Sequence, residues 1–158
     1  FKSQALLDES AVLACMAYVD LNPIRAKMDT TPETSKHTSI QNRIQALIKG
    51  EQPKKLMRFV GNHRQNMPKG IAYSLIDYCE LVDCTGRCIR AGYVEQHHSP
   101  ILEQLNINVE QWLTLTTEFE KHFSTAVGSE HMLQQFKQHT DHSRIRGMAK
   151  ARALLQSA

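Results

Sequence analysis

A tyrosine and an asparagine four residues apart are the most chemically suggestive pair in this sequence. Tyr18 and Asn22 lie in an apolar stretch that Pro23 interrupts, and Arg25 adds positive charge just beyond it. Residues four apart project from one face of a helix, so the phenol and the carboxamide are expected side by side. A phenol beside an amide oxygen and positive charge suits attack on a phosphodiester. The candidate chemistry is therefore placed at this helix end.

One helix must position this pair. Asp8 can cap a helix that runs to about Leu21, and Asn22-Pro23 is expected to end it, because the residue before a proline is pushed out of the helical region. Nearly every side chain in residues 11–19 is apolar. The helix should therefore be buried on most of its sides.

Several stretches resemble a known family. Residues 17–26 read AYVDLNPIRA and residues 1–9 read FKSQALLDE. Together they resemble the segment that follows the HUH motif in REP-associated tyrosine transposases, which are relatives of the single-tyrosine HUH transposases. Residues 59–61, 74–78 and 81–87 resemble the C-terminal region of larger members, and the match beyond them is looser.

The resemblance implies a reaction and the residues that perform it. Tyr18 matches the nucleophile that forms a 5′-phosphotyrosine bond with single-stranded DNA, and Asn22 falls where such enzymes place a polar group near a catalytic Mg²⁺ or Mn²⁺. The metal would polarise the scissile phosphate. The covalent bond would conserve the phosphodiester energy for rejoining the strand. The implied partner is hairpin-forming single-stranded DNA.

The sequence departs from this family at the metal site. An HUH site uses two histidines separated by one residue, and no His-x-His occurs in this chain. His97 and His98 are adjacent, so on a strand they would point to opposite faces. The chain also opens on Phe1 inside a recognisable motif. We therefore expect the C-terminal part of a longer protein, which is inactive without its upstream catalytic half.

The fold is expected to be mainly α. Residues 1–34 would be the end of a truncated α+β HUH catalytic domain, and residues 35–158 a helical, bundle-like accessory domain that holds DNA or assists formation of a homodimer. Capping patterns predict where its helices begin, at Thr38 with Gln41, Ser74, Ser99 with Pro100, Asn108 with Gln111, and Ser129.

An apolar stripe at helical spacing follows Asn108 and predicts a core-facing helix. It consists of Trp112, Leu115, Phe119 and Phe123. Gly128 is expected to end this helix. The last helix is expected over about 143–156.

Basic residues form three groups that could contact a phosphate backbone. Such contacts position nucleic acid without reading its bases, and several together make binding steeply salt-dependent. The candidate DNA-binding residues are Arg25 and Lys27, then Lys54, Lys55, Arg58, Arg64 and Lys69 in a long loop, and Arg144, Arg146, Lys150 and Arg152 near the C-terminus. Solvated surface charge is the alternative for each group.

Composition limits the other classes of function. The net charge of +3 permits nucleic-acid binding without requiring it, and no stretch approaches the roughly 18 apolar residues of a membrane span. Cys15, Cys79, Cys84 and Cys88 lack the spacing of zinc knuckles. We expect reduced thiols in a cytoplasmic protein, with a zinc site or disulfides as alternatives. The alternatives to the transposase are a non-catalytic helical DNA-binding module and an inactivated transposase derivative.

Overall fold

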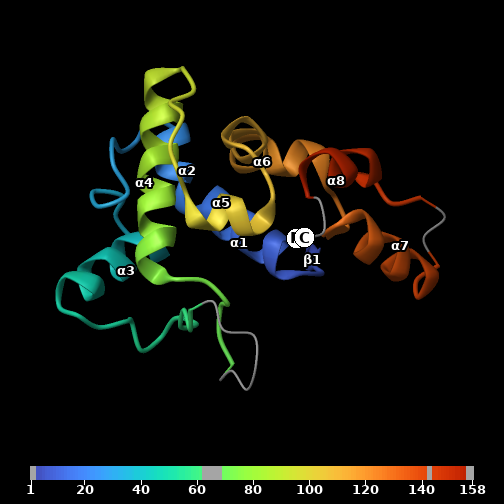
Figure 1. Cartoon of the computed structure of the whole chain (residues 1–158), viewed down its shortest axis with the longest axis horizontal. Coiled ribbons are helices and arrows are strands. Elements are labelled where there is room, and N and C mark those ends of the chain that lie inside the picture. The colour runs from blue at the N-terminus through green and yellow to red at the C-terminus, as the bar shows by residue number, and fades with distance from the viewer. Residues whose placement is uncertain (1–2, 62–68, 142–143, 156–158) are drawn as a thin grey trace. The chain divides into compact units, whose positions relative to one another are not determined.

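The computed structural model describes residues 3–61, 69–141 and 144–155. Over these residues the chain is mainly helical, with helices α1 to α8 and two strands of two residues each, which confirms the prediction that the fold is mainly α (Figure 1). The chain forms two compact units. Unit 1 comprises Phe1–Tyr18 and Leu102–Ala158, and unit 2 comprises Val19–Ile101. The predicted boundary after residue 34 lies within unit 2, and both it and the HUH origin of the first helix stay predictions.

Unit 2 is built on one long helix, α4 (Leu75–Ala91). The Ser74 hydroxyl accepts a hydrogen bond from the Asp77 N–H, so the predicted cap is confirmed. Two shorter helices, α2 (Asn22–Arg25) and α3 (Ser39–Ile48), pack against α4 (Figure 1). Gly86 permits the approach of α2, because a Cβ there would lie 2.9 Å from Cδ1 of Ile24.

The first helix, α1, spans Glu9–Asp20. Its predicted cap is confirmed, since the Asp8 carboxylate accepts a 2.9 Å hydrogen bond from the Ala11 N–H. Asn22-Pro23 does not simply end a helix, as expected, but begins the short helix α2. A proline is tolerated in a first helical turn, where its missing N–H has no partner to lose.

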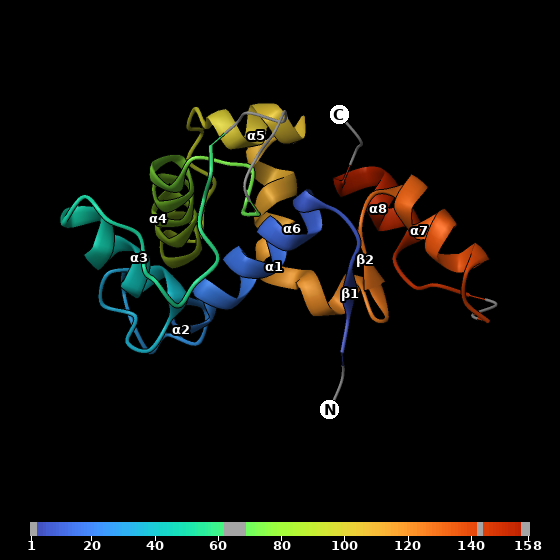
Figure 2. The same ribbon diagram turned by 90° about the horizontal axis from the view of Figure 1, so that it is seen from below.

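Unit 1 joins distant parts of the sequence. Strand β1 (Ala5–Leu6) pairs in parallel with β2 (Ala126–Val127), with Ala5 opposite Ala126 (Figure 2). Three helices accompany them: α6 (Val109–His122), α7 (Glu130–Gln138) and α8 (Met148–Leu154), and α8 packs against the other two. The predicted stripe of α6 is core, since its four members are at most 1% exposed.

Helix ends show where local prediction succeeded and where it failed. Asn108 and Gln111 form a reciprocal capping box, with two hydrogen bonds of 2.8 Å. Helix α5 (Pro100–Leu105) also begins where predicted. The prediction that α6 runs to Gly128 is wrong: it ends at His122 because residues 126–127 pair with β1. The last helix is shorter than predicted, and none of the described helices is long and apolar enough to cross a membrane.

Candidate functional site

Tyr18 lies near the C-terminal end of α1 and is the last residue of the N-terminal segment of unit 1. Its half-buried ring stacks on Phe119 of α6, with ring centroids 5.5 Å apart and planes inclined by 29°. Phe119 packs in turn on Phe123, with centroids 5.6 Å apart. Because Phe119 and Phe123 are almost fully buried, the tyrosine ring rests against side chains that have little freedom to move.

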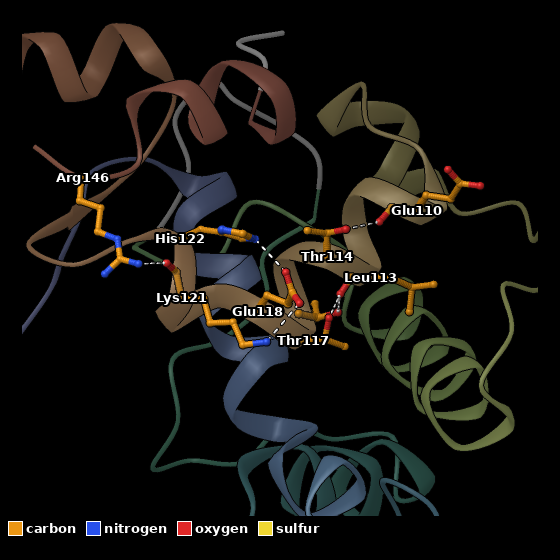
Figure 3. Close-up of polar contacts among 9 residues, drawn as sticks. Glu110, Leu113, Thr114, Thr117, Glu118, Lys121, His122 and Arg146 are labelled. Atoms are coloured by element: carbon orange, nitrogen blue, oxygen red, sulfur yellow. Dashed lines mark hydrogen bonds and ion pairs between the residues drawn. The ribbon is translucent and has the colours of Figure 1, made fainter.

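Helix α6 is kinked beside this aromatic cluster. Glu118 has non-helical backbone angles of φ −122° and ψ 20°. The Thr117 hydroxyl donates a 2.6 Å hydrogen bond to the Leu113 carbonyl, a type of contact that bends helices (Figure 3). The Glu118 carboxylate then pairs with Lys121 at 3.2 Å and His122 at 3.0 Å. Hydrogen bonding from Lys121 is the main reason that the pKa of Glu118 lies below its ordinary value.

Asn22 is the first residue of α2 and belongs to unit 2. Its carboxamide oxygen accepts a 3.1 Å hydrogen bond from the Arg25 guanidinium. Lys27 is exposed just beyond this helix. The metal contact of Asn22 and the DNA contacts of Arg25 and Lys27 stay predictions.

The central basic loop presents its charges to solvent. Lys54, Lys55, Arg58 and Lys69 are all exposed, and no carboxylate in the described part of the chain forms an ion pair with any of them. The fifth predicted residue, Arg64, lies outside the described residues. We call residues 52–61 and 69–71 the basic arm.

Phe59 anchors the basic arm to the core of unit 2. Its ring lies 5.0 Å from that of Tyr78, and the Arg43 guanidinium lies 4.9 Å from its centroid. The Gln52 side chain accepts a 2.8 Å hydrogen bond from the Phe59 N–H and donates one of 2.9 Å to the Phe59 carbonyl. These contacts turn Phe59 inward and leave its neighbour Arg58 outside.

The two segments of the arm lie side by side in a parallel bridge. Ile71 donates a 2.8 Å hydrogen bond to the Arg58 carbonyl and accepts one of 2.9 Å from the Val60 N–H. The intervening Gly70 is required, because a Cβ there would lie 2.5 Å from Val60 Cγ1 and 2.8 Å from the Arg58 carbonyl oxygen. Backbone pairing therefore places Arg58 and Lys69 on adjoining segments.

The predicted C-terminal basic group is divided by its contacts. Arg152 pairs with both carboxylate oxygens of Glu130. Arg146 donates a 2.6 Å hydrogen bond to a backbone carbonyl in the last turn of α6 (Figure 3). Arg144 and Lys150 are exposed. A phosphate would have to compete with Glu130 for Arg152, so this group offers less unpaired charge than the basic arm does.

Sequence reasoning missed a buried polar cluster in unit 2. Asp20 is fully buried, and its carboxylate accepts hydrogen bonds from the Ser39 hydroxyl at 2.6 Å, the Ile40 N–H at 3.1 Å and the Tyr78 hydroxyl at 2.7 Å. Burial raises the pKa of Asp20, and the three hydrogen bonds oppose that shift only in part. The available signal was a single acid inside an otherwise apolar stretch.

Arg43 and Cys79 lie near this carboxylate. Arg43 is 3% exposed and donates a 3.0 Å hydrogen bond to the Met57 carbonyl. Burial lowers the pKa of Arg43, while attraction to the Tyr78 and Asp20 oxygens opposes the shift. Burial also raises the pKa of Cys79 to about 11, which keeps this thiol protonated and unreactive at neutral pH. The cluster therefore serves to join helices rather than to react.

Unit 1 contains an open cleft of about 630 Å³ beside α1 and α6. Its lining includes Cys15, Glu120 and Arg146, but not Tyr18. Burial, with a smaller contribution from Glu120, raises the pKa of the Cys15 thiol. The cleft is therefore lined by one carboxylic-acid residue, one arginine and a thiol whose pKa is raised.

Metal-ligating side chains do not cluster in the described part of the chain. No group of three or more His, Cys, Asp or Glu side chains among them could hold a metal ion, and all four cysteines are free thiols. Comparison with protein-family models, curated proteins and solved structures finds no match for this chain. The resemblance to REP-associated tyrosine transposases therefore rests on the quoted sequence stretches alone.

Proposed function

We propose that this chain is the C-terminal part of a transposase that cleaves and rejoins single-stranded DNA through a 5′-phosphotyrosine intermediate at Tyr18. The observation that carries the proposal is the run at residues 17–26, in which Tyr18 is followed by Asn22, Pro23 and Arg25. The stacking of the Tyr18 ring on Phe119 supports it, because a held ring limits the directions in which the hydroxyl can attack.

The proposed reaction is a displacement at phosphorus. The Tyr18 oxygen bonds to the phosphorus as its phenolic proton leaves, and the 3′ oxygen of the upstream strand departs and takes up a proton. Rejoining reverses the step, with a 3′ hydroxyl displacing the tyrosine. The described residues contain no group of three or more His, Cys, Asp or Glu side chains that could hold a metal ion beside Asn22. No step is therefore assigned to a metal on this chain, which we propose to be inactive by itself.

The test is a covalent-adduct assay on the product of the full reading frame that encodes this chain. A hairpin oligonucleotide labelled at its 3′ end is incubated with the protein and Mg²⁺ or Mn²⁺, and a denaturing gel separates free from protein-bound label. A 5′-phosphotyrosine bond retains the 3′ fragment, so the label should move with the protein. Tyr18→Phe should abolish the adduct, while the control Tyr93→Phe, at a residue 65% exposed, should leave it unchanged.

Two results would overturn the proposal: an adduct that persists in Tyr18→Phe, or no adduct with either metal ion. Tyr18→Phe keeps the ring and its stack on Phe119. The substitution should therefore cost no more than one hydrogen bond, about 0.5–1.5 kcal/mol of unfolding free energy. Loss of the adduct in a folded variant can then be assigned to the missing hydroxyl.

A second candidate is a non-catalytic helical DNA-binding module. The observation that favours it is the basic arm, whose cations have no ion-pair partner in the described part of the chain. Such a module would bind DNA equally well in the wild type and in Tyr18→Phe, and it would form no covalent adduct. The same two preparations therefore separate the two candidates.

A further inference from the structure

We infer that the basic arm is a docking surface for the phosphate backbone of double-helical DNA, and that it does not hold unpaired strands. The surface belongs wholly to unit 2, whereas the proposed nucleophile Tyr18 belongs to unit 1. This inference goes beyond the proposed strand cleavage, and it stands whether or not Tyr18 forms a covalent bond.

Charge is concentrated in this one stretch. The basic arm contains four lysines and arginines and no acidic residue, so it carries +4 in a chain whose net charge is +3. The rest of the chain is therefore slightly negative. A local positive field of this kind attracts a polyanion to the arm in preference to the rest of the surface.

The arm is also held in shape before any ligand arrives. Phe59 is 4% exposed and fixed by Gln52, and the parallel bridge joins Arg58 to the segment that carries Lys69. Ordering a mobile loop on binding would cost conformational entropy, and a loop that is already fixed avoids most of that cost. The backbone that carries Arg58 is therefore fixed before a phosphate binds.

The burial of the aromatic residues in and around the basic arm favours paired over unpaired DNA as its ligand. Proteins that bind single strands stack the bases on exposed aromatic rings. Residues 49–73 contain no tryptophan, and their only phenylalanine and tyrosine, Phe59 and Tyr73, are 4% and 5% exposed. Neither of these two rings is exposed enough for a base to stack on it. Paired DNA hides its bases and presents about one charge per 1.7 Å of helix axis, which suits a surface that offers cations alone.

The experiment measures fluorescence anisotropy of a labelled 20-base-pair duplex and of a single strand of the same length and no self-complementarity. The chain is titrated into each labelled DNA, and the titration is repeated at salt concentrations from 0.05 to 0.5 M. Four phosphate contacts, those of Lys54, Lys55, Arg58 and Lys69, predict a slope of log affinity against log salt of about −3.6 on the duplex. The duplex should also bind more tightly than the single strand at every salt concentration.

Two matched double variants test whether the basic arm is the surface that binds the duplex. Lys54→Ala with Lys55→Ala should weaken duplex binding at least about tenfold at 0.1 M salt and make the slope shallower by about 2. Lys36→Ala with Lys137→Ala removes the same charge from exposed lysines outside the arm and should change the affinity less than about twofold. Because all four side chains are exposed, neither pair should unfold the protein.

Arg58→Lys tests the nature of the contact, since a phosphate held by charge alone tolerates lysine. We expect it to bind duplex nearly as well as the wild type, whereas Arg58→Ala should not. Tighter binding of the single strand, equal losses in the two double variants, or no measurable duplex binding would each overturn the inference. The Tyr18 adduct assay is scored separately, so failure of one proposal is distinguishable from failure of the other.

Discussion

The Tyr78 hydroxyl donates a 2.7 Å hydrogen bond to the buried carboxylate of Asp20, and this bond joins the last residue of α1 to the first turn of α4. The other carboxylate oxygen accepts hydrogen bonds from the Ser39 hydroxyl and the Ile40 N–H at the start of α3. Within unit 2, one carboxylate therefore links the last turn of α1 to the starts of α3 and α4. A buried acid without these donors would be strongly destabilising, so the stability of unit 2 depends on keeping all three.

Tyr78→Phe should destabilise the protein by about 1.5–3 kcal/mol, because it removes a donor from a buried carboxylate and keeps the ring packing. The midpoint of urea unfolding measures the loss. Tyr93→Phe is the matched control, since Tyr93 is 65% exposed, and it should change stability by less than about 0.5 kcal/mol. Equal effects of the two substitutions would show that the hydrogen bond from the Tyr78 hydroxyl to Asp20 does not contribute to the free energy of unfolding.

Asp20→Asn should change how stability depends on pH. Burial raises the pKa of Asp20 above its ordinary value of about 3.9, so the folded state holds this proton more tightly than the unfolded state does. The resulting stabilisation is fully present below about pH 4 and is lost as pH rises through the folded pKa. Wild type should therefore lose stability relative to Asp20→Asn over that window.

Urea unfolding of both proteins at intervals from pH 3 to pH 7 measures this difference. The Asn oxygen can still accept from Ser39 and Ile40, so the variant should fold at every pH tested. Parallel stability curves would contradict the expected linkage. A wild type that gains stability relative to the variant as pH rises would mean that the pKa of Asp20 is depressed in the folded state.

Gly70→Ala should disrupt the basic arm. The new Cβ would lie 2.8 Å from the Arg58 carbonyl oxygen, and that backbone atom cannot move without breaking the bridge to Ile71. Overpacking of this kind costs about 1–3 kcal/mol. Gly92→Ala is the control: it has no atom within 4 Å but a φ of +75°, so it should cost about 1–2 kcal/mol through its backbone alone.

The two glycine variants should differ most clearly in DNA binding. Gly70→Ala shifts the segment that carries Lys69 and should weaken the duplex complex, whereas Gly92→Ala should bind as the wild type does. Anisotropy titrations at a temperature where both variants remain folded provide the comparison. Unchanged duplex affinity in Gly70→Ala would show that the spacing of Arg58 and Lys69 does not matter for binding.

Asn108→Ala should remove the capping box of α6 and cost about 1 kcal/mol of unfolding free energy. Both hydrogen bonds of the box measure 2.8 Å, and the Gln111 amide additionally donates to the Ala153 carbonyl. Asn108→Ser can still accept from the Gln111 N–H and should retain most of the stability. If thermal unfolding shows the alanine and serine variants to be equally destabilised, the cap is not the source of the loss.

Local chemistry made much of the helical structure predictable from sequence. Asp8, Ser74 and Asn108 were expected to cap helices and do so, because a cap bonds to an N–H three residues away. The apolar stripe of α6 was expected to be core for a similar reason, since its spacing alone places the side chains on one face. The basic residues of the arm could also be named in advance, because charge is a property of residue type.

The sequence by itself therefore determined the mainly α class, most helix starts and the candidate pair Tyr18 and Asn22. Only the tertiary structure decided that β1 pairs with a segment more than a hundred residues away and that Phe119 stacks on Tyr18. It also decided that the Asp20 carboxylate accepts a hydrogen bond from the Tyr78 hydroxyl, and that the segments carrying Arg58 and Lys69 are joined by a backbone bridge. These contacts join residues distant along the chain, and no periodicity or cap within a few residues specifies which distant partner a side chain will meet.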